Sequence, residues 1–172
     1  MDNISEQLVK INKTPKDYFL LGGIWVAAFF IVFLFVLLGF KMPSFFGILI
    51  LVSAGVMYGA YKLSSLLSIE YEYIVVNRDM DIDKITARSS RKRIVSIKLN
   101  EVEEFGVYSQ QKANALANRN FSCRFICCNS GDDAYYLTYN HPKKGMILLI
   151  LAMNERTKSE AMKTIPRIAL SD

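Results

Sequence analysis

Four cationic side chains within six residues form the densest charge cluster of the sequence. Arg88, Arg91, Lys92 and Arg93 belong to the segment RSSRKR, which contains no acidic residue. A hairpin tip with this charge can contact anionic lipid headgroups or an acidic partner, and each cation near an anionic leaflet contributes about 1 kcal/mol. These four residues are our candidate contact site for lipid or a protein partner. A solvated turn that binds nothing is the alternative.

Metal, redox and nucleophilic chemistry have little basis in the sequence. Cys123, Cys127 and Cys128 do not show CxxC spacing, and His141, the only histidine, precedes Pro142 in a predicted surface turn. The odd cysteine count is typical of a reducing compartment rather than of a secreted disulfide framework. No GxSxG and no glycine-rich phosphate motif occurs. We expect the cysteines in core strands, no cofactor, no metal site and no catalytic residue.

Two carboxylates, Asp81 and Asp83, lie two positions apart on one face of a predicted strand. Such a pair could bind a cation or serve acid–base chemistry. We expect instead that they occupy a solvent-facing edge of the strand.

Two long apolar segments precede all of these residues. Neither residues 18–40 nor residues 44–61 contain a charged side chain. A helix over the first segment would be about 34 Å long, enough to cross a hydrocarbon core of about 30 Å. Lys41-Met42-Pro43 separates the segments, and the roughly 105 residues that follow them are too few to bury both helices in a soluble core. We therefore predict a transmembrane helical hairpin over residues 18–67.

Small residues recur at four-residue spacing within both segments, as Gly23 with Ala27 and as Gly55 with Gly59. Such faces let helices approach closely in lipid. We expect them to pack the two helices of one chain together, and self-association into a homo-oligomer is the alternative. Neither segment holds an interior acid, which argues against an ion pathway.

Lysine and arginine residues indicate the orientation of the hairpin. Residues 1–17 carry three lysines and the connection between the helices carries only Lys41, whereas Lys62, Arg78 and Lys84 lie at or beyond the end of the second helix. Because positive residues favour the cytoplasmic side, both termini are expected in the cytoplasm, with two spans in the cell membrane.

The overall charge of the chain favours anionic membrane lipid as a partner. The net charge is +5 and the pI is about 9.1, which favours contact with anionic membrane lipid. Basic and acidic residues are mixed along most of the chain, which argues against nucleic acid as a ligand.

Residues 1–17 form a polar tail before the first helix. Ile4, Leu8 and Ile11 recur at near-helical spacing, and we expect either a short amphipathic helix on the membrane surface or a frayed terminus, with equal support for both. Pro15 either ends that helix or stands in the first turn of the next one.

After residue 67 the hydrophobic pattern alternates with a period of two, which is typical of strands. The glycine-containing loop 129–133 is expected to join two strands as a hairpin, and residues 109–120 are expected to form a loop or a loosely held helical turn. The predicted strands, about seven and antiparallel, cover residues 69–76, 80–87, 93–99, 105–108, 121–128, 134–139 and 146–152.

A single helix is expected to follow the last strand. Asn154 can cap its first turn, and Ala161, Met162, Ile165 and Ile168 give it an apolar stripe. The predicted domain, residues 68–172, is thus a set of antiparallel strands with one C-terminal helix.

Seven antiparallel strands closed by one C-terminal helix resemble the pleckstrin-homology-like roll. Two spans directly before IEYEYIVVNRDMDIDK and KRIVSIKLNEVEEFGVY are similar to bacterial membrane proteins with a cytoplasmic domain of this kind. In particular, the chain resembles an uncharacterised family of small two-span proteins from Gram-positive anaerobes, known only as a domain of unknown function. The resemblance implies an α+β membrane protein and provides neither a substrate nor a site residue. The first hairpin loop, Asn77-Arg78-Asp79, does not match the basic phosphoinositide motif of eukaryotic members.

These observations predict a non-catalytic, membrane-anchored module whose cytoplasmic domain binds a protein partner or an anionic lipid surface. An accessory subunit of a transporter or secretion assembly, with the transmembrane helices as the contact, is the alternative. An enzyme whose site the sequence does not reveal is a third reading. The expected organisation is a tail over residues 1–17, a membrane hairpin over 18–67 and a soluble domain over 68–172.

Overall fold

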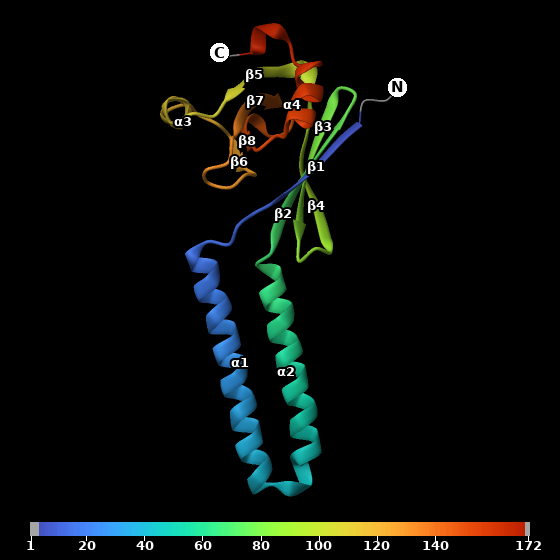
Figure 1. Ribbon diagram of the computed structural model, residues 1–172, viewed down its shortest axis with the longest axis vertical. Coiled ribbons are helices and arrows are strands. Elements are labelled where there is room, and N and C mark those ends of the chain that lie inside the picture. The colour runs from blue at the N-terminus through green and yellow to red at the C-terminus, as the bar shows by residue number, and fades with distance from the viewer. Residues whose placement is uncertain (1–3, 171–172) are drawn as a thin grey trace. The chain divides into compact units, whose positions relative to one another are not determined.

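The computed structural model describes residues 4–170, which divide into two compact units. The first, here the helical unit, comprises residues 12–69 together with the short segment 86–89. The second, here the sheet domain, comprises the described residues of 4–11, 70–85 and 90–170. Figure 1 shows that long helices make up the first unit and that strands dominate the second.

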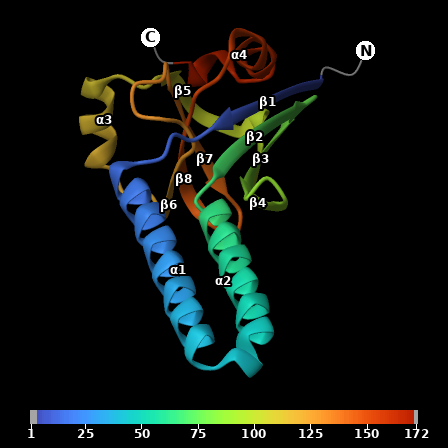
Figure 2. The same cartoon turned by 60° about the horizontal axis from the view of Figure 1, so that its bottom comes forward.

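The helical unit is a hairpin of α1 (Pro15–Lys41) and α2 (Phe46–Leu66), joined through a 3-10 turn at Pro43–Phe45. Thr14 and Asp17 form a capping box at the start of α1, because each side chain bonds the backbone N–H of the other. Pro15 occupies the first turn of α1, which confirms the second of the two positions expected for it, at the start of a helix rather than at the end of one. Figure 2 shows the two helices running side by side.

Both helices are long and apolar enough to cross a membrane. The best windows have mean hydropathies of 2.8 for α1 and 1.7 for the second helix with its preceding turn, and only 6 % of each window is buried. A core helix of a soluble protein would be mostly buried. The outward-facing side chains of this hairpin are instead exposed, as Phe19, Phe40 and Leu51 illustrate.

The contact between α1 and α2 uses small residues other than those singled out from the sequence. Ala28 and Gly39 of α1 and Ala60 of α2 are buried, and a Cβ atom at Gly39 would collide with the ring of Phe46. A Cβ atom added at Gly23, Gly55 or Gly59 would meet nothing within 4 Å, and Ala27 is exposed. Open space beside these glycines indicates that they do not form the closest contact between α1 and α2, and helix packing through the four residues stays a prediction.

The first sheet has the strand order β1-β2-β3-β4. Strands β2 (Ile69–Val76), β3 (Asp79–Thr86) and β4 (Ser90–Lys98) follow one another as hairpins, as the twofold alternation predicted. The first strand, β1 (Ile4–Lys10), comes from the other side of the helical hairpin.

β1 corrects the prediction of a helical tail. It pairs with β2 along its whole length, from Ile4 opposite Val76 to Lys10 opposite Glu70. The buried residues of β1 are Ser5 and Val9, whereas Ile4 and Leu8 are more than half exposed. The segment therefore follows the twofold period of a strand, and residues 4–11 belong to the sheet domain rather than to a separate tail. Residues 1–3 of the predicted tail lie outside the described residues.

The second sheet has the order β5-β7-β8-β6. Its strands are β5 (Val102–Val107), β6 (Cys123–Ile126), β7 (Tyr135–His141) and β8 (Gly145–Leu151). β6 pairs with β8 in parallel and does not pair with β7, so the hairpin predicted around residues 129–133 is wrong. The glycine in that loop marks a turn, but it does not determine which strand the chain joins next.

Two short helices complete the sheet domain. Ser109 caps α3 (Gln110–Ala117), which forms where a loop or helical turn was expected, and Asn154 caps α4 (Glu155–Met162) as predicted. The apolar stripe of α4 is only partly confirmed. Ala161 and Ile165 are buried, but Met162 is partly exposed and Ile168 is 99 % exposed. The reason is that α4 ends at Met162, so Ile168 no longer follows the phase of that helix.

The two sheets enclose one main core. Tyr73 from β2, Ile82 from β3, Leu137 from β7 and Leu149 from β8 are fully buried in it. The Tyr73 hydroxyl donates a hydrogen bond to the Cys127 carbonyl and so connects the two sheets. A smaller cluster lies on the other face of the second sheet, where α3 covers it through Leu116. The fold class is α+β, as expected. The strands of residues 4–170 number eight rather than about seven, they form two sheets, and one pair is parallel.

Candidate functional site

The predicted basic tip is split between a turn and a strand. Ala87 and Arg88 form the turn with positive φ angles of 55°, and the Ala87 N–H donates to the carbonyl of Ser68, just beyond α2. β4 begins at Ser90, so Arg91, Lys92 and Arg93 lie within the strand. The tip is therefore shorter than the charge pattern suggests.

Arg91 and Arg93 are paired with carboxylates of neighbouring strands. Arg91 binds Glu72 and lies 3.8 Å from Asp83, while Arg93 binds Asp81 at 2.9 Å and Asp83 at 3.0 Å. Asp83 is only 3 % exposed, and it lies between both guanidinium groups. The expectation that Asp81 and Asp83 form a solvent-facing edge is wrong, because the arginines of β4 cover them.

The pairing changes what these arginines can do. A buried carboxylate without a partner is costly, so Glu72 and Asp83 require the charges of Arg91 and Arg93. The hydrogen bond that Arg93 donates to Asp83 raises the pKa of Arg93 further, so its charge is permanent. Both arginines therefore hold β2, β3 and β4 together, and they contribute little net charge to an outside ligand.

Lys92 differs from its two neighbours. It is exposed, and among the described residues no carboxylate lies within salt-bridge distance of its amine. Of the predicted contact site, Lys92 is thus the position most suited to meet an external anion.

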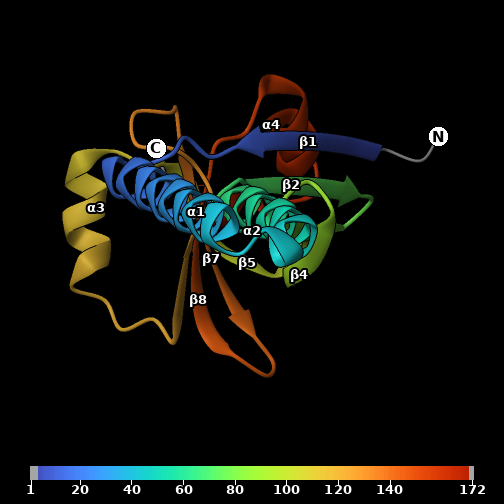
Figure 3. The same ribbon diagram turned by 90° about the horizontal axis from the view of Figure 1, so that it is seen from below.

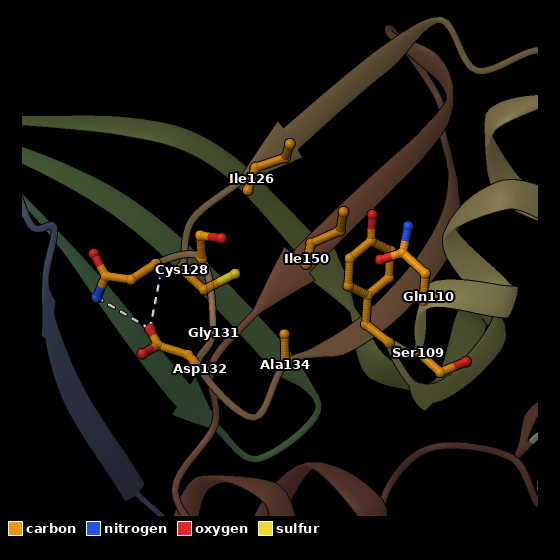
Figure 4. Close-up of a pocket in the computed structure, with 11 residues that line it drawn as sticks. Ser109, Gln110, Ile126, Cys128, Gly131, Asp132, Ala134 and Ile150 are labelled. Carbon is orange, nitrogen blue, oxygen red and sulfur yellow. Dashed lines mark hydrogen bonds between the residues drawn. The ribbon is translucent and has the colours of Figure 1, made fainter. Parts of the chain in front are cut away.

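A separate cavity of about 440 Å³ lies between the start of α3 and the loop after β6. Figure 4 shows the Cys128 thiol and the Gln110 amide on opposite sides of it, with Ile150 between them in this view. Asp132 is fixed at the rim, because one of its oxygens accepts hydrogen bonds from the backbone N–H and the side-chain amide of Asn129, at 2.8 and 3.0 Å. Apart from the glycine-containing loop, no sequence motif indicates this cavity.

The chemistry of the cavity is that of a mixed polar and apolar pocket. Burial, and secondly the charge of Asp132, raise the pKa of the Cys128 thiol. A thiol that stays protonated at neutral pH is a poor nucleophile. Asp132 is the carboxylate of this lining; Asn129 holds it by hydrogen bonds, and its charge disfavours the thiolate.

The remaining cysteines and the histidine have structural surroundings. Cys127 is buried, as expected, and burial raises its pKa to about 12; Cys123 and Cys128 are only partly buried. His141 Nδ1 accepts hydrogen bonds from the backbone N–H groups of Lys143 and Lys144, so it stabilises its own turn. Within residues 4–170, no three His, Cys, Asp or Glu side chains come together as metal ligands would.

Comparison with known proteins assigns nearly the whole chain to one family. No curated protein and no solved structure matches it. The family model described as "Bacterial PH-like domain (DUF6106)" matches residues 1–171, which includes β1, both long helices and both sheets. This description names a fold and indicates no catalytic activity. The chain therefore belongs to the DUF6106 family of bacterial PH-like domains.

Proposed function

We propose that the protein is a non-catalytic, membrane-anchored module whose sheet domain operates at the cytoplasmic face of the cell membrane. The observation that carries the proposal is the exposure of the apolar helical unit. Large side chains such as Phe19, Phe30 and Leu51 project outward along both helices. Exposed apolar surface of this extent is unfavourable in water, and a hydrocarbon layer about 30 Å thick would cover it.

The pairing of β1 with β2 supports the same side of the membrane for the start of α1 and the end of α2. β1 precedes α1 and β2 follows α2, and these strands pair residue by residue. Two strands of one sheet must occupy the same compartment. Two membrane crossings between them satisfy that requirement, whereas a single crossing would separate them.

The charges of the helical unit support the cytoplasm as that compartment. Lys13, Lys16 and Lys62 lie towards the ends of the helices that connect to β1 and β2, and Asp17 is the acid among them. The opposite end of the hairpin carries only Lys41. Positive residues are retained on the cytoplasmic side, so the sheet domain belongs there.

Short connections keep the sheet domain near the bilayer. Four residues, 11–14, separate β1 from α1, and two residues, 67–68, separate α2 from β2. Four extended residues span at most about 14 Å. A domain tethered so closely meets the anionic leaflet at high effective concentration, which favours lipid contact through basic residues such as Lys92. A protein partner at the same surface is compatible with this arrangement.

A second candidate function has support from the open faces of the helices. Gly23, Gly55 and Gly59 have free space where a side chain would stand, and the partner helix within the chain does not fill it. In lipid, small residues of this kind let another helix approach closely. An accessory subunit of a transporter or secretion assembly, or a homo-oligomer, would use this face.

Membrane fractionation tests the main proposal. The full chain is expected to stay in the pellet when membranes are washed with alkaline carbonate, and to be extracted only by detergent. A cysteine placed at Ser44, between the helices, should react with an impermeant maleimide in intact cells, whereas a C-terminal tag should resist external protease. Release of the chain by carbonate, or digestion of the tag from outside, would refute the proposal.

A further inference from the structure

The turn between β7 and β8 carries two lysines to the first sheet. Residues 142–144 form this turn, and Lys143 and Lys144 are both exposed. The Lys144 amine donates a hydrogen bond of 2.6 Å to the backbone carbonyl of Ile94 in β4. It also lies 5.3 Å from the centroid of the Phe125 ring. The turn is therefore held against β4, although Lys144 and Ile94 are 50 residues apart in the chain.

This contact brings a third lysine into the same region. Lys92 lies two residues before Ile94, and residues two apart project from the same face of a regular strand. Among the described residues, no carboxylate lies within 4 Å of the amines of Lys92, Lys143 or Lys144. The neighbouring arginines of β4 are already bound to acids, so the three lysines provide the net positive charge.

The lysines also lie towards a particular end of the sheet domain. β4 starts beside the end of the first sheet where Lys10 and Glu70 pair, and where the chain connects to both long helices. The opposite end of the first sheet holds Arg78, whose carbonyl accepts a hydrogen bond from Leu99. Lys92 precedes Leu99 by seven residues, or about 23 Å at the rise of a strand.

We propose that Lys92, Lys143 and Lys144 form one lysine surface that holds the sheet domain against the headgroups of anionic lipids. The inference rests on the proposed membrane anchoring and specifies which face of the domain meets the leaflet. Lysine amines are flexible point charges, which suits lipid phosphates of many kinds rather than one stereospecific headgroup. A stable protein interface would require an apolar centre, but Ile94 and Phe125 beside the lysines are already packed against the core.

Amine-reactive labelling of the full chain in nanodiscs tests the surface directly. Lys92 and Lys143 should react at least about threefold more slowly in discs with about 30 % phosphatidylglycerol than in pure phosphatidylcholine, since anionic lipid attracts them. Salt at about 1 M should remove the difference, because screening then acts within about 3 Å. Lys98 and Lys163, which are paired with Glu101 and Glu160, serve as internal references. Equal rates in both lipids at Lys92 and Lys143 would overturn the inference.

A variant with a matched control separates charge from folding. With a photo-crosslinking residue at Pro142, Lys92→Gln with Lys143→Gln should lower crosslinking to phosphatidylglycerol by about fivefold for each charge removed. Arg78→Gln with Arg167→Gln removes the same charge at the other end, where Thr164 contacts Asn77, and should leave the yield unchanged. Equal losses in both variants would contradict a localised surface.

Two further outcomes keep this inference distinct from the anchoring proposal. A chain that remains in the discs but shows no lipid-dependent protection refutes the lysine surface alone, whereas a chain that leaves neutral discs refutes the anchoring itself. Protection of the lysines in neutral discs by added poly-glutamate, with none from phosphatidylglycerol, would assign the surface to an acidic protein and overturn the lipid contact.

Discussion

Lys10 and Glu70 lie directly opposite each other in neighbouring antiparallel strands, and the entire helical hairpin is inserted between them in the chain. Figure 3 shows β1, the strand of Lys10, beside β2 and α4. The sheet domain is thus assembled from two segments of the chain. In chain order, the helical unit stands between β1 and β2, where a short turn would join two such paired strands in a soluble protein.

Removing the helical unit should therefore give a soluble, folded sheet domain. If Asn-Gly replaces residues 12–68, Ile11 and Ile69 are joined by a two-residue turn that suits the antiparallel pairing of β1 and β2. We expect a monomer in detergent-free buffer with a cooperative thermal transition, measured by gel filtration and circular dichroism. Residues 69–172 alone, the matched comparison, should be less stable because the edge of β2 loses β1. Equal stability of the two proteins would show that β1 is dispensable.

Gln7 should stabilise the attachment of β1. Its amide nitrogen donates to the Ala152 carbonyl at 2.7 Å, and its oxygen accepts from the Asn154 N–H at 2.8 Å. Replacing Gln7 by Ala leaves both backbone groups without this partner, at an expected cost of about 1–3 kcal/mol in the free energy of unfolding. Urea titration of the excised domain measures it. Glu6→Ala on the exposed face of β1 should change stability by no more than about 0.5 kcal/mol.

Asp83→Asn should destabilise the sheet domain although it conserves the shape of the side chain. The substitution leaves Arg91 and Arg93 with fewer carboxylates, and both arginines are about half exposed, which lowers the cost relative to a fully buried pair. We expect a loss of about 1–3 kcal/mol, measured by urea denaturation. Asp133→Asn, in an exposed loop, is the control. A wild-type midpoint for Asp83→Asn would show that the ion cluster contributes nothing to stability.

The pKa of Cys127 predicts a loss of stability in alkali. Burial raises this pKa from 9.0 to about 12, so the folded protein binds the thiol proton more tightly than the unfolded chain does. The resulting stabilisation is complete below pH 9 and is lost as the pH rises from 9 towards 12, by up to about 1.4 kcal/mol per pH unit. Denaturation at pH 8, 9 and 10 measures the slope. Cys127→Ala should have a shallower slope, and identical slopes would argue against this assignment.

Gly39 and Gly55 should respond differently to enlargement. Gly39→Leu inserts a side chain against Phe46 and should separate α1 from α2 within the chain. Gly55→Leu meets open space, so the hairpin should form normally, while crosslinking to a second chain or to a larger assembly should decrease. Native-membrane crosslinking and gel electrophoresis measure both. Val52→Leu, on an exposed part of α2, controls for bulk; unchanged crosslinking in Gly55→Leu would exclude this face as the contact.

Features that depend on neighbours in the sequence were predictable. The extents of α1 and α2 follow from uninterrupted apolar segments, the hairpins of β2, β3 and β4 follow from twofold alternation, and Asn154 was identified as a cap from its place before an acidic first turn. Each of these signals depends on residues a few positions apart. Periodicity therefore suffices to read them.

β1 was predicted wrongly for a physical reason. In a segment of seven residues, Ile4 and Leu8 fit a helix by spacing and a strand by parity, so the local pattern is ambiguous. Its partner β2 begins after the whole helical hairpin, and that pairing decides the conformation. The same holds for β6, whose parallel partner β8 lies beyond β7.

The sequence by itself determined the apolar helical hairpin of α1 and α2, the class of fold and the presence of a basic segment. Only the tertiary structure decided which of those cations are available, because Glu72, Asp81 and Asp83 reach Arg91 and Arg93 from other strands. It also brought the β7–β8 turn to β4 through Lys144. Charge neutralisation depends on distances of 3–4 Å in space, and linear order does not encode these distances.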